Sequence, residues 1–191
     1  MSLLGFLTVT ENVRYGFIGG YLVLNISARP VEFHCTAPVR ATRAQEILYG
    51  TTLRAFLCGE QIAPTLIQRS KNMPMLFLTD YPFVLSAQNQ INAPMIYVPQ
   101  NPRQQEIRLS EFGMDGETAR EKVLRESVLD ADGNPLNMTV VHGKEFGIAE
   151  NPPQHSREEI LTWIETFSEK MDLLEPFERI RLALEEAQRA A

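Results

Sequence analysis

Two β-rich runs near the start of the chain limit most strongly what it can fold into. The segments YLVLN (21–25) and VEFHC (31–35) are separated only by the short stretch ISARP. Strand, short turn and strand predict an antiparallel hairpin. Because successive side chains of a strand point to opposite faces, Cys35 should face the core with Phe33, and His34 should face the other way.

Helix-start signals follow this hairpin. Thr42-Arg43-Ala44-Gln45 has the pattern of a capping box, which predicts a helix that Gly50 ends. A second helical stretch is expected over about 52–70, and the Gly and Pro within it predict a break near residues 59–63.

Further along, short apolar runs alternate with turn residues such as Pro and Gly, which is typical of strands joined by tight connections. We expect strands over 3–9, 75–79, 83–87, 95–99, 106–110 and 136–141, and a helix over 117–128.

The C-terminal segment has the clearest helical pattern. Ser156-Arg157-Glu158-Glu159 is a second capping box, and apolar residues then recur at helical spacing. We predict a long amphipathic helix bent at Pro176. Its apolar stripe could cover the chain's own core or a second copy, and we expect a homodimer through this helix. The candidate interface residues are Phe177, Ile180 and Leu184.

The order of these elements predicts an α+β fold with a mainly antiparallel sheet covered by helices. We divide the chain into an α+β domain over 1–150 and a C-terminal helical arm over 151–191, which packs on the domain or on a partner copy.

The paired strands in GYLVLNISARPVEFHC, followed by a helix and three more strands, resemble the profilin-like layout of roadblock, longin and PAS-type modules over residues 3–99. The resemblance implies a ligand-sensing or protein-docking module rather than a catalyst. The segments GYLVLN, RPVEFHCTAPVR and RAQEILYG also resemble an uncharacterised bacterial protein family. No activity is assigned to that family, so this resemblance implies none.

Composition narrows the class of protein. Hydrophobic residues at 44% and charged residues at 22% are typical of a soluble globular chain, and the net charge of -6 argues against nucleic acid as a partner. The start of the chain has no signal-peptide pattern, and no apolar run is long enough for a membrane span. Two cysteines form no disulfide framework, so we expect reduced thiols and a cytoplasmic location.

Catalytic and metal-binding patterns are sparse. Cys35 beside His34 could supply a nucleophile and a base, but adjacent strand residues point apart, so Cys35 would need His142 or His155 instead. A buried thiol that behaves as a small hydrophobe is the interpretation we favour. The histidines and cysteines lack the close pairing of zinc ligands, so we expect no metal and no cofactor.

An anion-binding site at the start of the first predicted helix has a stronger physical basis than the catalytic and metal sites. Arg40 and Arg43 lie at its start, where free N–H groups and the helix dipole favour negative charge, and His34 could join them. Solvated arginines at a helix start are the plainer interpretation.

We therefore predict a non-enzymatic binding, adaptor or ligand-sensing module that acts through protein contacts or a small anionic ligand. The alternative from the sequence is a small cytosolic enzyme acting on an anionic substrate, with Cys35 or with His34, Arg40 and Arg43 at its site.

Overall fold

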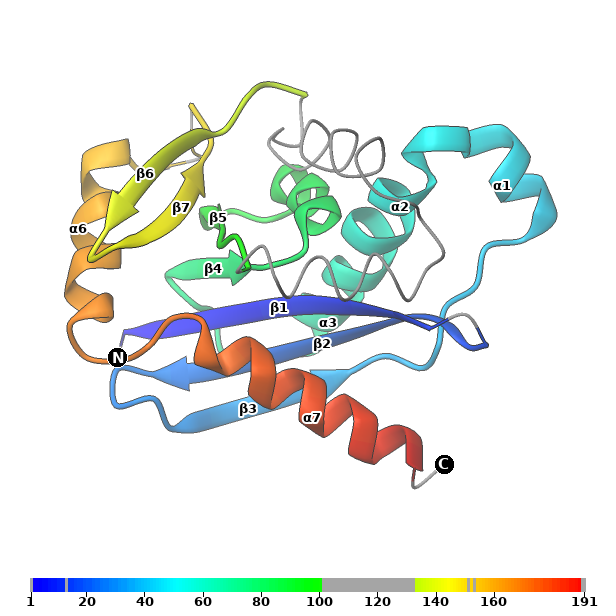
Figure 1. The fold of residues 1–191 in the computed structure, drawn as a ribbon, viewed down its shortest axis with the longest axis horizontal. Helices are drawn as coiled ribbons and strands as arrows, with labels where there is room; N and C mark the ends of the chain where they lie inside the picture. Colours follow the sequence, from blue (N-terminus) through cyan, green and yellow to red (C-terminus); the bar gives the residue numbers. More distant parts are fainter. Residues whose placement is uncertain (1, 13, 101–132, 151, 153, 190–191) are drawn as a thin grey trace.

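A sheet of seven strands runs through the part of the chain that the structure, a computed structural model, describes (Figure 1). That part is residues 2–12, 14–100, 133–150, 152 and 154–189. The strands are β1 (Leu3–Asn12), β2 (Gly16–Asn25), β3 (Pro30–Cys35), β4 (Leu76–Thr79), β5 (Met95–Tyr97), β6 (Asn137–Val141) and β7 (Lys144–Ile148). Their order across the sheet is β3-β2-β1-β4-β5-β7-β6.

The sheet is mixed, and this corrects the expected fold class. Strands β1, β2 and β3 form an antiparallel meander, but β4 lies parallel to β1 and β5 lies parallel to β4. The pair β6–β7 then closes the far edge in antiparallel fashion. The α+β class is confirmed, whereas the mainly antiparallel, profilin-like arrangement is wrong. The physical reason is the helical crossover between β3 and β4, which carries the chain back before β4 so that β4 runs in the direction of β1.

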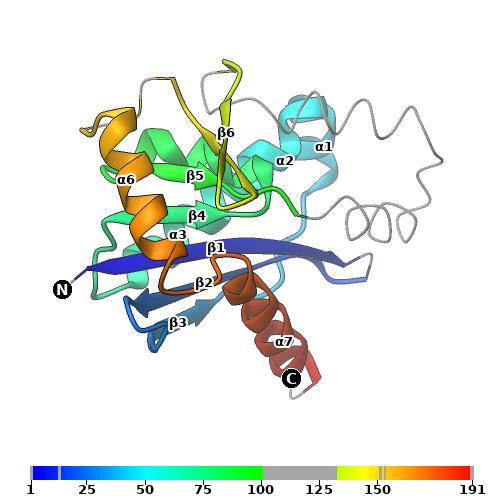
Figure 2. The same cartoon turned by 60° about the vertical axis from the view of Figure 1, so that its left-hand side comes forward.

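Helices cover both faces of the sheet (Figure 2). One face carries α6 (Arg157–Ser168) and α7 (Glu175–Arg189), whose apolar side chains form one buried cluster with the strands. The other face carries the crossover helices and the helix that precedes β5. These are α1 (Arg43–Tyr49), η1 (Gly50–Thr52), α2 (Leu53–Ala55), η2 (Phe56–Ile62), α3 (Ala63–Arg69) and η3 (Pro82–Gln90).

The central strand β1 is buried on both faces, as expected for a strand between two helical layers. Leu4 and Phe6 lie in the cluster with α7, whereas Leu7 and Val9 lie in the cluster with η2 and α3. The alternation predicted for β3 is confirmed for Cys35, which packs against the α7-side cluster, whereas Phe33 on the same face is 39% exposed and lies outside the core.

Both capping boxes are confirmed. Thr42 and Ser156 each accept a hydrogen bond from the third helical residue, whose side chain bonds back to the cap. The predicted break near residues 59–63 is a π-helical turn, η2, in which Gly59 packs against Ser86.

Two expectations differ from the structure, and two lie outside its description. The strand predicted over 83–87 is the 3₁₀ helix η3, which Pro82 starts and which Ser86 ties to Ala55 O by a hydrogen bond of 2.9 Å. The predicted long C-terminal helix is two separate helices, α6 and α7. The strand predicted over 106–110 and the helix over 117–128 fall outside the described residues.

The candidate interface residues lie inside the chain's own core. Phe177, Ile180 and Leu184 are each at most 1% exposed, because α7 crosses β1 and β2 and covers them. The approach is close: a Cβ added to Gly20 would lie 2.2 Å from Ile180 Cγ2. These side chains therefore have no exposed surface to offer a second copy. Among the described helices, none is both long and apolar enough to cross a membrane.

Candidate functional site

A cluster of polar side chains is buried where α7 crosses the centre of the sheet. The register Leu7–Thr79 makes Thr8 and Asp80 the next residues of the parallel strands β1 and β4. Thr8 is 0% exposed and Asp80 is 4% exposed. Because Phe6 and Leu78 point toward α7, alternation places Thr8 and Asp80 on that same face.

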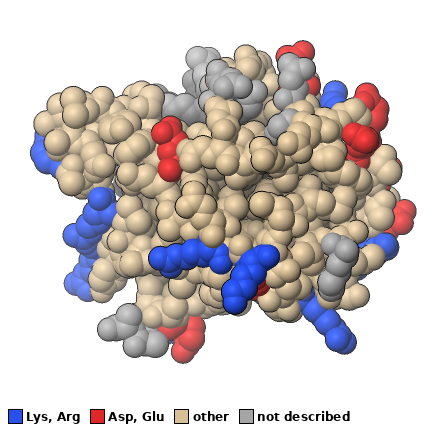
Figure 3. All heavy atoms as spheres, turned by 180° about the vertical axis from the view of Figure 1, so that it is seen from behind, with Lys and Arg blue, Asp and Glu red and all other residues tan. Residues whose placement is uncertain are grey.

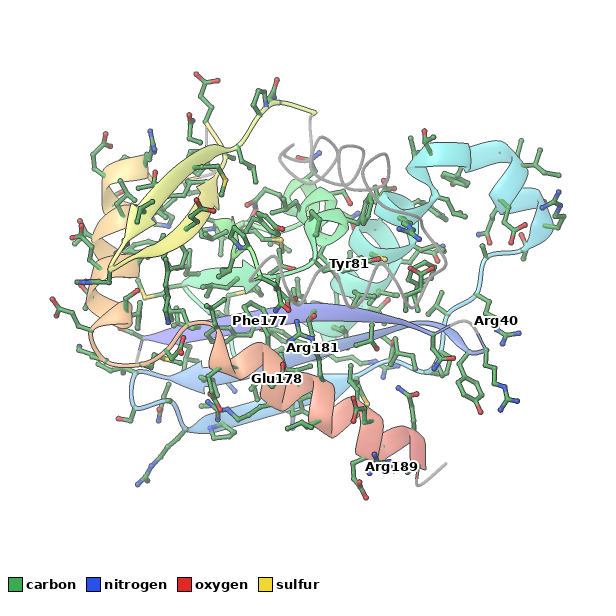
Figure 4. The ribbon with its side chains drawn as sticks, in the orientation of Figure 1. Arg40, Tyr81, Phe177, Glu178, Arg181 and Arg189 are labelled. Atoms are coloured by element: carbon green, nitrogen blue, oxygen red, sulfur yellow. The ribbon has the colours of Figure 1, made fainter. Side chains whose placement is uncertain are left out.

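Helix α7 supplies the opposite charge (Figure 4). Phe177 packs edge-on against Phe6 with ring centroids 5.5 Å apart, and Arg181 follows one turn later. The Arg181 guanidinium forms an ion pair with Asp80 and a 3.0 Å hydrogen bond with Glu178. Burial lowers the pKa of Arg181 to about 10, which leaves it a cation at neutral pH.

Three polar atoms of this Asp80–Arg181 centre retain hydrogen-bonding capacity. Within the described part of the chain, Thr8 Oγ1, Asp80 Oδ1 and Arg181 Nε are buried without a hydrogen-bond partner. Gln100, just beyond β5, donates to the other oxygen of Asp80. Buried polar atoms normally have partners, so a group of three that lack them marks a position for a ligand or water.

The centre lies at the carboxyl end of β4 and beside the middle of β1; open sheets with parallel strands usually bind ligands at the carboxyl ends of those strands. A groove of about 240 Å³ opens beside it between β1 and α7, and its lining includes Thr10, Asn12, Arg181 and Gln188. No group of three or more His, Cys, Asp or Glu that could hold a metal ion occurs among the residues described. The buried charged groups of the centre are the Asp80 carboxylate and the Arg181 guanidinium.

An exposed basic and aromatic tip stands at the carboxyl end of β1. The turn from β1 to β2 carries Arg14 and Tyr15, whose backbone N–H groups donate to Asn12 Oδ1 at 2.8 and 3.2 Å. A Cβ added to Gly16 would lie 2.7 Å from Arg40 Cγ, so Arg40 lies against this turn. Tyr15 is 49% exposed. Neither Arg14 nor Arg40 forms an ion pair with a described residue.

Charge is unevenly distributed around the molecule. Seen from behind, basic side chains predominate on the left and along the lower half, and acidic ones gather mainly toward the upper right (Figure 3). The left of that view corresponds to the side of the β1–β2 turn in Figure 1. Residues 1–73 carry seven basic and four acidic side chains, in contrast to the chain's net charge of -6. The arginines at the tip therefore belong to a locally basic part of an acidic chain.

Comparison with known proteins gave matches only among solved structures; no family model and no curated protein matches the chain. Human endonuclease V matches with a TM-score of 0.49 and 15% identity, over 100% of this chain and 87% of that one. Endonuclease V of Ciona intestinalis, in complex with DNA containing an inosine, matches with a TM-score of 0.40 and 14% identity, over 86% and 76% of the chains. Marinitoga piezophila Argonaute, with guide RNA and target DNA, matches with a TM-score of 0.37 and 14% identity, over 90% and 26%.

These matches contradict several expectations from the sequence. The proteins found are endonuclease V and an Argonaute in complex with guide RNA and target DNA, and the Ciona complexes contain DNA. The predictions of a profilin-like, non-enzymatic adaptor or binding module without a nucleic-acid partner are therefore wrong. The net charge of a chain is a weak guide to such a partner, because phosphate binding depends on the local arrangement of cations and not on the total. At these TM-scores and identities, the likeness by itself assigns no activity to this chain.

The predicted anion-binding residues do not come together. The His34 ring lies 3.4 Å from Glu32 Oε2 and stacks on Tyr21. Arg43 pairs with Glu46 at 2.8 Å on the exposed surface of α1. Arg40 alone of the three joins a cluster of basic residues, at the β1–β2 turn.

The side chains of the alternative catalytic site also lie apart from one another: Cys35, His142 and His155. Cys35 packs against the apolar cluster under α7. His142 lies in the turn between β6 and β7, and His155 packs against Trp163 with ring centroids 4.7 Å apart. Burial raises the pKa of the other thiol, Cys58, which keeps it protonated.

Glu32 has a structural role that predicts a measurable pH dependence. Its carboxylate accepts a hydrogen bond from Ser70 Oγ, which is the main cause that lowers its pKa from 4.5 to about 2. Asn72 Nδ2, at 2.7 Å, adds to this effect. Because the folded-state pKa is the lower one, the stabilisation is present above about pH 4.5 and is lost as pH falls toward 2.

Replacing Glu32 by Gln should therefore lower the melting temperature at neutral pH and have little effect near pH 2. Thermal unfolding of both proteins across this range measures the difference. The variant Glu46→Gln, at an exposed ion pair, is the control and should follow the native protein. A constant difference between native protein and Glu32→Gln at every pH would contradict the assignment.

Sequence reasoning missed Thr8, Arg181, Arg14 and Tyr15, and for Asp80 it favoured a turn over the lining of a pocket. One signal was available: Arg181 interrupts the apolar stripe of the C-terminal helix one turn after Phe177, on its buried face. A charged residue on that face needs a buried partner, and the acidic residue directly after the apolar run MLFLT is a natural candidate.

Proposed function

We propose that this chain binds single-stranded nucleic acid at the tip formed by Arg14, Tyr15 and Arg40 and acts on it at the Asp80–Arg181 centre. The observation that carries the proposal is the placement of two arginines without described ion pairs and an exposed tyrosine at the carboxyl end of β1, the strand that also carries Thr8 of the centre.

The chemistry of the tip suits an unpaired strand. Guanidinium groups bind phosphate oxygens and release the counterions that surround them. An exposed tyrosine can stack on a base only where that base is not already stacked in a duplex. Basic groups combined with an exposed aromatic ring therefore favour a single strand over a double helix.

A second concave surface adjoins the tip. Phe17 and Val39 exchange backbone hydrogen bonds of 2.8 Å, which ties the segment 36–39 to the start of β2. This segment lines a groove of about 600 Å³ whose opposite wall includes Gln68 and Arg69 of α3. Amide and guanidinium groups along the groove would let a strand continue past the tip.

The centre offers two roles in phosphodiester hydrolysis. Arg181 would stabilise negative charge on a phosphoryl oxygen, and Asp80 would accept a proton from the attacking water. The unpartnered Asp80 Oδ1 and Arg181 Nε favour this assignment, because they are the groups of the centre that can still hydrogen-bond to a ligand.

Binding should depend on the tip. We expect Tyr15→Ala to weaken binding of a fluorescent oligonucleotide about tenfold, since one base stack contributes about 1–3 kcal/mol. Arg14→Ala and Arg40→Ala should each weaken binding and reduce its logarithmic salt dependence by about 0.7, because each removes one phosphate contact. Fluorescence anisotropy at several salt concentrations measures both quantities.

The matched control is Arg29→Ala, an exposed arginine in the β2–β3 turn at the opposite end of β1. It should leave the affinity and the salt dependence nearly unchanged. The same samples, with and without a divalent cation, are then analysed for strand cleavage in the native protein and in Asp80→Asn. Absence of binding at low salt, or equal losses in Arg29→Ala and Arg40→Ala, would refute the proposed tip. Cleavage that Asp80→Asn leaves intact would refute the proposed centre.

A further inference from the structure

Strand β3 is the outer strand on one side of the sheet, and its outer backbone edge is open. It pairs with β2, and no described strand lies beyond it. Thr36 N donates to Gly19 O at 3.0 Å, so the residue after β3 directs its backbone groups toward β2. Because these groups alternate along a strand, those of Phe33 and Cys35 point to the open edge.

The side chains of this edge are unusually apolar. On the face that also carries α7, Val31 is 37% exposed and Phe33 is 39% exposed. Outer strands usually avoid pairing with other chains through Lys, Pro or a bulge. In β3 such features occur only at the start of the strand, where Pro30 stands and where the register shifts opposite Val23 and Leu24. The stretch 32–36 has neither Lys nor Pro and remains able to pair.

The polar side chains on the other face of the strand are complementary to those of a second copy. Glu32 and His34 flank Phe33, and both point toward the α3 side. Hydrogen bonds from Lys71 N at 3.1 Å and from Asn72 hold the Glu32 carboxylate in place. An antiparallel copy centred on Phe33 would place Glu32 opposite the partner's His34, and His34 opposite the partner's Glu32. In such a cross-strand pair the imidazole can donate a hydrogen bond to the carboxylate, which favours the pairing.

We propose that β3 pairs with β3 of a second copy of this chain, antiparallel and centred on Phe33, so that the sheet continues across a two-fold axis. This arrangement exchanges backbone hydrogen bonds between the two Phe33 residues and buries their half-exposed rings against each other. It uses a surface separate from the buried stripe of α7, and it does not depend on nucleic-acid binding.

Sedimentation velocity of the full chain over a series of concentrations tests the pairing. The native protein should reach twice the mass of one chain as concentration rises. Phe33→Lys should raise the dissociation constant at least about tenfold, because it removes the aromatic pair and sets two like charges opposite each other. The matched control is Val140→Lys on β6, the other outer strand, where Val140 is 65% exposed. It should leave the dissociation constant unchanged.

A cross-link tests the register. In the double variant Phe33→Cys with Cys35→Ser, the two introduced thiols would lie on directly opposed residues, about 5.5 Å apart between Cα atoms, within disulfide range. Oxidation of this variant should give a covalent dimer on a non-reducing gel, and circular dichroism checks that it is folded. A single-chain mass for the native protein at every concentration, a dimer that Phe33→Lys leaves unchanged, or a folded double variant that does not cross-link would each overturn the proposal.

Discussion

Replacing Asp80 by Ala is expected to lower the free energy of unfolding by about 3–5 kcal/mol, because it leaves the Arg181 guanidinium buried without its partner. The Asp80 side chain is 0% exposed and that of Arg181 is 10% exposed, so the guanidinium would lose its carboxylate at a position with little access to bulk water. For a chain of this length the melting temperature should fall by about 10 °C. Urea unfolding followed by circular dichroism measures the change.

Two further variants separate the buried pair from general damage at this position. Asp80→Ala combined with Arg181→Leu removes both charges and should recover much of the lost stability, since a buried ion pair replaced by apolar groups costs little. Glu178→Ala removes the outer partner of Arg181, whose side chain is 59% exposed, and should cost less than about 1 kcal/mol. If the double variant is as unstable as the sum of the single variants, Asp80 and Arg181 are not coupled.

Replacing Phe177 by Ala should cost a comparable amount, about 3–5 kcal/mol, through a different mechanism. Phe177 is 0% exposed and packs edge-on against Phe6, so its removal leaves a cavity between α7 and the sheet. The same urea titration detects this loss.

Leu182 provides the control on the same helix. It is 59% exposed, and Leu182→Ala should change the free energy of unfolding by less than about 0.5 kcal/mol. If Phe177→Ala were as mild as Leu182→Ala, then α7 would not cover the core as described. Under that result the sequence-based interpretation of Phe177 as an anchor for a second copy would regain its basis.

The two large predictions bear on the proposed function. The same helix that completes the apolar core also carries Arg181 to the carboxyl end of β4, beside the middle of β1. A variant that loosens α7, such as Phe177→Ala, should therefore alter the Asp80–Arg181 centre and leave the tip at Arg14 and Tyr15 in place. Stability and oligonucleotide binding measured on the same variants separate these two parts of the site.

Much of the local structure followed from the sequence alone, because local signals act over a few residues. Side-chain alternation placed Cys35 and His34 on opposite faces of β3, and the two capping boxes located the starts of α1 and α6. Where tertiary contacts compete with propensity, such reasoning failed. The run at 83–87 has a strand-like composition, yet packing of Ser86 against the crossover helix leaves it as η3.

The sequence by itself determined which segments become strands and helices in most of the described chain, and that the chain has an α+β fold. Only the tertiary structure decided that β4 lies parallel to β1, and that α7 crosses the sheet above them. Those two facts bring together Thr8, Asp80 and Arg181, which stand far apart in the sequence. The physical reason is that periodicity reports which face of an element is buried, whereas the partner it meets there depends on the long-range packing of the whole core.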